Sequence, residues 1–78
     1  MMTVSALSSC LRQMYDSAPE GEQIAMIHLF GIRYANEIKN EGCSPKDIIL
    51  AAQMKPSLAT ELNKGIKLAA YVVEKADN

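Results

Sequence analysis

Apolar residues recur every three or four positions along almost the whole chain, and no stretch alternates apolar and polar residues as a half-buried strand does. The first segment shows the pattern, because Val4, Leu7, Leu11 and Met14 fall on one helix face. A chain of 78 residues rarely divides into two cores. The sequence therefore predicts a single all-α domain over residues 1–78, folded as a compact bundle of four helices.

Two short segments carry the signals of a helix start. Ser17-Ala18-Pro19-Glu20 and Ser44-Pro45-Lys46-Asp47 both have the spacing of a capping box with proline in the first turn. We expect the first helix to end near residues 16–18, and a long second helix to run from the first box to Glu41. Gly42 is its expected stop. A short third helix should follow the second box and end near Gln53.

The last helix is expected to open at Pro56 and Ser57. Its predicted inner face is a stripe about 80° wide, at about 100° per residue, formed by Leu58, Leu62, Ile66, Ala69 and Val73. The stripe keeps its phase through Gly65, which favours one continuous helix. A break at Gly65 would instead make residue 66 the start of a fifth helical segment.

Composition and charge exclude several classes of protein. The net charge of −1 argues against indiscriminate binding to nucleic acid. The longest apolar runs are far shorter than the roughly 20 residues that span a bilayer, and the N-terminus lacks a secretory pattern, so we expect a cytoplasmic protein. One histidine and two distant cysteines do not form a standard zinc site. Without a catalytic constellation or a phosphate-binding loop, we expect neither an enzyme nor a cofactor, metal or small-molecule substrate.

A short helix, a tight connection and a second helix with a polar outer face have the layout of a helix-turn-helix. Residues 44–65 (SPKDIILAAQMKPSLATELNKG) resemble the helix-turn-helix of small bacterial and phage repressor-like proteins, and the chain resembles small HTH-like domains. Five apolar positions match those by which the motif packs its helices: Ile48, Ala52, Met54, Ala59 and Leu62.

The chain departs from the family pattern at three positions, one of which is Leu58, where the family often has a polar residue. Ile49 stands where the family has a small residue, so we expect it to push the helices apart or to point away. Gln53 stands where the family has glycine, and it must adopt a turn conformation that glycine takes more easily.

The resemblance implies binding to double-stranded DNA, with the second helix of the motif in the major groove, as in a small transcriptional regulator or a DNA-targeting module. Short polar side chains can address base edges and lysines can neutralise phosphates, but no arginine is available on this face for a guanine. The candidate DNA-contacting residues are Lys46, Lys55, Ser57, Thr60, Asn63, Lys64 and Lys67.

The alternative is a protein-interaction or homodimerisation module of the same shape that binds no DNA. The acidic pI and the front half of the second helix, which is apolar nearly all round, favour it. On this interpretation the lysines are a solvated helix face. The candidate interface residues are Met26, Leu29, Leu68, Tyr71 and Val72. A homodimer would also double the number of DNA contacts.

Overall fold

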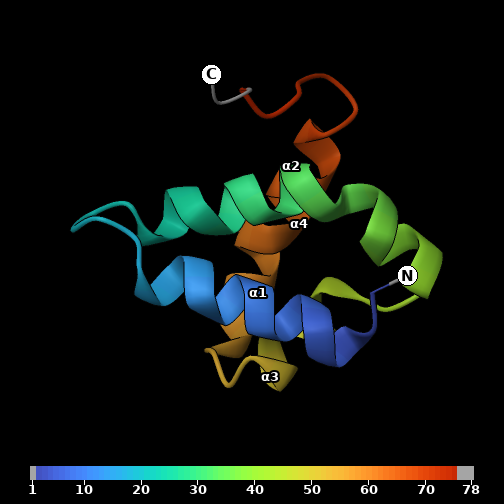
Figure 1. Ribbon diagram of the computed structural model, residues 1–78, viewed down its shortest axis with the longest axis horizontal. Helices are drawn as coiled ribbons and strands as arrows, with labels where there is room; N and C mark the ends of the chain where they lie inside the picture. The colour runs from blue at the N-terminus through green and yellow to red at the C-terminus, as the bar shows by residue number, and fades with distance from the viewer. Residues whose placement is uncertain (1, 76–78) are drawn as a thin grey trace.

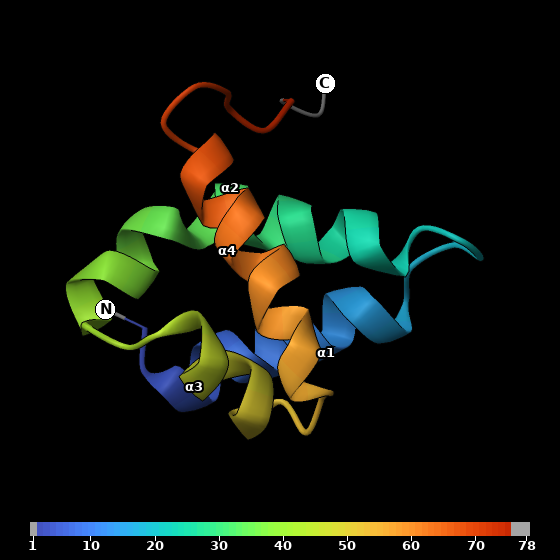
Figure 2. The same ribbon diagram turned by 180° about the vertical axis from the view of Figure 1, so that it is seen from behind.

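The computed structural model describes residues 2–75, and within them it contains four α-helices, one 3₁₀ turn and no strand. The elements in chain order are α1 (Val4–Asp16), α2 (Gln23–Glu41), α3 (Pro45–Ala51), η1 (Pro56–Leu58) and α4 (Ala59–Leu68). This confirms the predicted all-α class. Figure 1 shows α1 and α2 side by side and antiparallel, with α4 crossing behind them, and Figure 2 shows the same crossing from the other side. None of the described helices is long and apolar enough to cross a membrane.

One hydrophobic core joins all four helices. Its fully buried side chains are Leu7, Leu11, Ile27, Phe30, Ile48, Ile49 and Leu62. Removing a side chain of this size from water stabilises the fold by about 1.5–3 kcal/mol. Every helix therefore depends on contact with the others for its stability.

The connection between α1 and α2 differs from the prediction. The Ser17 hydroxyl does not cap α2; it donates to the carbonyl of Gln13 (2.7 Å) and closes α1. Pro19 begins a tight turn, in which the Glu22 N–H donates to the Pro19 carbonyl (2.9 Å) and Gly21 takes a φ of +83°. Glycine adopts this conformation without steric cost. The predicted start of α2 at the first box is thus wrong, because Gly21 turns the chain before the helix begins at residue 23.

The α2–α3 connection follows the prediction. Gly42 ends α2 in the left-handed conformation (φ +74°). The capping box is complete, since the Asp47 N–H donates to the Ser44 hydroxyl (3.1 Å) and the Ser44 N–H donates to the Asp47 carboxylate (2.9 Å).

The last helix is shorter than predicted. It follows η1 and continues through Gly65, as expected, but it ends at Leu68. Val73, predicted to lie on the inner stripe, is 89% exposed. In Figures 1 and 2 the end of α4 projects beyond α2, so no core remains there to cover further turns. The chain turns instead, and Glu74 forms an ion pair with Arg33 of α2.

Helices α2 and α4 cross at two glycines, one on each helix. A Cβ atom on Gly31 would lie 2.7 Å from the backbone nitrogen of Ile66, and one on Gly65 would overlap the carbonyl oxygen of His28. Real Cβ atoms do not approach backbone atoms this closely. The two helices therefore touch backbone to backbone, and this contact fixes the position of α4.

Candidate nucleic-acid interface

Helices α3 and α4 contact each other, with residues 52–58 between them, in the stretch where the sequence predicts the helix-turn-helix. Four of the five matched apolar residues are buried, namely Ile48, Ala52, Met54 and Leu62. The fifth, Ala59, is half-buried and packs against the same core. The apolar positions of the motif thus hold α4 against the rest of the domain and leave its opposite face to solvent.

The turn of the motif has the strained residue that the sequence predicts. Gln53 has a φ of +60°, a left-handed conformation that is uncommon for residues other than glycine. Its N–H donates to the Leu50 carbonyl (3.0 Å), and the Met54 N–H donates to the Ile49 carbonyl (3.0 Å). These bonds close the end of α3 and set the direction in which the chain enters η1.

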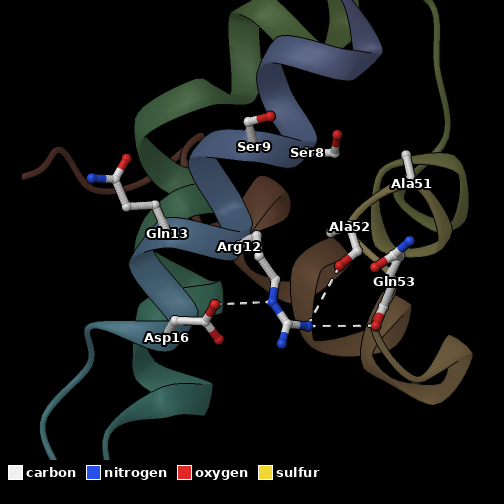
Figure 3. A pocket seen from close by; sticks show the side chains of 8 residues that line it. All are labelled: Ser8, Ser9, Arg12, Gln13, Asp16, Ala51, Ala52 and Gln53. Atoms are coloured by element: carbon white, nitrogen blue, oxygen red, sulfur yellow. Dashed lines mark hydrogen bonds and ion pairs between the residues drawn. The ribbon is translucent and has the colours of Figure 1, made fainter.

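Arg12 of α1 supports this turn, a contact that the sequence does not reveal. Its guanidinium donates to the carbonyls of Ala52 (3.5 Å) and Gln53 (3.4 Å) while it pairs with Asp16 (3.0 Å), as Figure 3 shows. A cation stabilises the negative end of a helix, where carbonyl groups lack partners within the helix. Only the i,i+4 spacing of Arg12 and Asp16 could have drawn attention to this residue.

Of the two outcomes expected for Ile49, the structure contradicts one: the side chain does not point away from the domain, because it is fully buried. Helix α1 packs against α3, and Ile49 belongs to the same core as Leu7 and Leu11 of α1. A large residue fits at this position because α1 encloses it.

All seven predicted DNA-contacting side chains are exposed. Thr60, Lys64 and Lys67 follow one another at helical spacing along the outer face of α4. Lys46 of α3 shares a shallow depression with Thr60 and Asn63, so these residues from the two helices face the same solvent region.

The other predicted residues lie towards the ends of this surface. Lys64 and Lys67 line a second shallow groove together with Leu68 and Tyr71. Lys55 lies apart from them, in a depression that Arg12 and Tyr15 of α1 also line. Ser57 is exposed in η1.

An acidic residue on α4 modifies the charge of this surface. Glu61 accepts a hydrogen bond from Lys64 (3.2 Å), and its other oxygen lies 2.8 Å from Nε2 of His28 on α2. These contacts, the one with His28 first, lower the pKa of the Glu61 carboxyl below its ordinary value. Lys64 is therefore partly neutralised, whereas Lys67 has no carboxylate partner among the ion pairs of residues 2–75. The i,i+3 spacing of Glu61 and Lys64 is visible in the sequence, but the contact with His28 is not.

The candidate interface residues fall into two groups. Met26 and Leu29 of α2 are half-buried. At the end of α4, Leu68 and Val72 are 42% and 45% exposed, and Tyr71 is 85% exposed.

The described residues contain two free cysteines and no cluster of potential metal ligands. Both cysteines are unpaired and half-buried, and burial raises the pKa of the Cys43 thiol, which keeps it in the less reactive protonated form. No group of three or more histidine, cysteine or acidic side chains within residues 2–75 could hold a metal ion.

A family model described as an HTH-like domain matches residues 3–75, nearly the whole chain. No curated protein sequence and no solved structure matches this chain.

Proposed function

Because the chain belongs to the HTH-like domain family, we propose that it binds double-stranded DNA through the outer face of α4. The observation that carries the proposal is the position of α4 in the motif: its apolar side is packed against the domain, while Thr60, Asn63, Lys64 and Lys67 are exposed. On this proposal the protein acts as a small transcriptional regulator or as a DNA-targeting module.

The size and chemistry of the surface fit a major groove. An α-helix with its side chains is about 10–12 Å in diameter, which fits a major groove about 12 Å wide, and the ten residues of α4 extend about 15 Å along it. Asn63 has the amide that pairs with the N6 and N7 atoms of adenine, and Thr60 offers a hydroxyl and a methyl group. Since no arginine lies on the described outer face of α4, we expect weak discrimination in favour of guanine.

The lysines supply the part of the DNA-binding free energy that does not depend on base sequence. Lys46 and Lys67 flank the polar face, Lys55 lies at the entrance to η1, and Lys64 shares its charge with Glu61. For each phosphate that a lysine neutralises, a tenfold rise in salt concentration lowers the logarithm of the association constant by about 0.9. With three to four phosphate contacts, the slope for one copy of the chain should be about −3 to −4.

Fluorescence anisotropy with a labelled random-sequence duplex, at two or more salt concentrations, tests the proposal. We expect measurable binding at low salt that weakens with this slope. Lys67→Glu should weaken binding and reduce the magnitude of the salt slope by about 1, whereas Lys39→Glu, which makes the same charge change at an exposed position of α2, should retain most of the affinity. Binding that is insensitive to salt, or equal losses in both variants, would contradict a role for α4.

The second candidate function is a protein-interaction module that binds no DNA. It is favoured by one observation, the exposure of Leu68, Tyr71 and Val72 beside the lysines of α4. Absence of any duplex binding at low salt, together with a stable complex through these residues, would favour this function over DNA binding.

A further inference from the structure

The outer end of α4 combines an apolar floor with positive charge. Lys64, Lys67, Leu68 and Tyr71 line one shallow groove, and we call these four residues the α4 end. Its two apolar side chains are 42% and 85% exposed. Exposed apolar residues are common singly, but here two of them lie beside two lysines, so this surface offers a partner both apolar contact and positive charge.

The turn that precedes α2 has the opposite charge, and the first turns of α2 are apolar. Glu20 and Glu22 are exposed, and neither takes part in the ion pairs of residues 2–75. Met26 and Leu29 follow them and are half-buried. Leu29 lies about 200° around the helix from the core residue Ile27, so it faces away from the core. We call Glu20, Glu22, Met26 and Leu29 the α2 start.

We propose that the α4 end of one copy of the chain docks on the α2 start of a second copy. The two surfaces are complementary in charge, with Lys67 and the partly neutralised Lys64 on one and two carboxylates on the other, and each offers apolar side chains for the centre of the contact. Charge complementarity of this kind guides association and selects the partner. The occupant is therefore a second copy of this chain.

The two surfaces are different, so each copy can offer one and receive the other. Such a contact links copies head to tail and gives rings or longer assemblies unless the pairing is reciprocal. The proposal does not depend on DNA binding, because it concerns contacts between protein surfaces alone.

Sedimentation or light scattering of the protein without DNA, over a range of concentrations, tests this contact. We expect the mass to rise above the 8.5 kDa of one chain as the concentration increases. The charge reversals K64E/K67E and E20K/E22K should each abolish association. An equimolar mixture of the two variants should restore it, since each then offers the surface that the other lacks.

Matched controls separate this contact from general effects of charge. K46E/K55E reverses two exposed lysines outside both surfaces, so it should leave self-association intact. Tyr71→Ser removes apolar surface without a change in charge, and because the Tyr71 side chain is 85% exposed, the fold does not depend on it. This variant should weaken association about tenfold, as truncation of a central aromatic residue does in protein interfaces.

Three results would overturn the proposal. One is a single-chain mass at every concentration up to about 1 mM, which corresponds to a standard binding free energy weaker than about −4 kcal/mol. Another is self-association that survives both charge reversals. The third is failure of the mixed variants to associate although circular dichroism shows that each is folded and the wild type does associate.

Discussion

Gly65 is a residue whose lack of a side chain determines how two helices meet. Within a helix, alanine is more favourable than glycine by about 1 kcal/mol. Here the added Cβ would overlap the carbonyl oxygen of His28, and that atom belongs to the backbone of α2 and cannot turn aside. The steric cost therefore exceeds the gain in helix propensity.

We predict that Gly65→Ala lowers the free energy of unfolding by about 1–3 kcal/mol, the usual cost of overpacking a core. Urea unfolding followed by circular dichroism measures the change. Lys67→Ala, on the exposed face of the same helix, should change stability by less than about 0.5 kcal/mol. A Gly65→Ala variant as stable as the wild type would contradict the close crossing.

Glu61 makes stability depend on pH. His28 and Lys64 hold the pKa of its carboxyl below the ordinary value, so the folded state favours the ionised form. The contribution is present above the unfolded pKa of about 4.3 and is lost as the pH falls through the lower folded value. We predict that Glu61→Gln makes the free energy of unfolding fall less steeply on acidification through this range, as measured by urea unfolding at several pH values.

The control for this prediction, at protein concentrations below those of self-association, is Glu20→Gln, which removes an exposed carboxylate outside the ion pairs of the described residues. Its acid profile should match that of the wild type. Asp47 and Glu74 also have lowered pKa values, through the Ser44 backbone N–H and Arg33 respectively, so the Glu61→Gln profile should become flatter but should not lose its slope.

At the scale of elements, two segments with the same sequence signal have different structures. Ser17 and Ser44 each precede a proline and an acidic residue, but only Ser44 caps a helix. We predict that Ser44→Ala lowers the free energy of unfolding by about 1 kcal/mol, as expected for loss of an N-cap. Ser17→Ala should cost less, because its hydroxyl only adds a bond to a carbonyl at the exposed end of α1. Thermal or urea unfolding compares the two variants, and equal losses would contradict the difference in capping.

The elements that the sequence predicts well are those determined by local signals. Apolar spacing predicts α1, Gly42 predicts the end of α2, and the second capping box predicts the start of α3. The start of α2 is missed because Gly21 favours a turn over continuation of the first box. The end of α4 depends on where α2 stops covering it. The apolar spacing within the last segment carries no information about how far along α4 this cover extends.

The same distinction applies to the candidate site. The exposed polar face of α4 and the left-handed turn at Gln53 follow from local spacing and from the family resemblance. Arg12 and His28 act on the motif from 40 and 33 positions away in the sequence. Periodicity describes which face of a helix is buried, but it does not say which distant polar side chain meets that helix.

At the scale of the whole molecule, charge is divided between two regions. Residues 1–43 contain three basic and five acidic residues, whereas residues 44–78 contain five basic and four acidic residues. The four lysines proposed to contact DNA all belong to the second region, and the acids of the α2 start belong to the first. A nearly neutral chain can thus present a surface that attracts phosphates and another that attracts lysines.

Both proposals use Lys64 and Lys67, so DNA and a second copy of the chain should compete for the α4 end. We predict that addition of a short duplex to the self-associated protein at low salt releases single copies bound to DNA. Analytical ultracentrifugation with labelled DNA would detect both species, because their masses differ.

Tyr71→Ser provides the control for this competition, since it weakens self-association without altering a charge. At protein concentrations where the wild type is assembled, this variant should bind the duplex at a lower total concentration than the wild type does. Assemblies that bind DNA while their size is unchanged would contradict the competition, because a lysine ammonium buried against carboxylates of a neighbouring copy is not available to a phosphate. The outer face of α4 would then bind only one of the two partners, and variants of Lys67 would identify which.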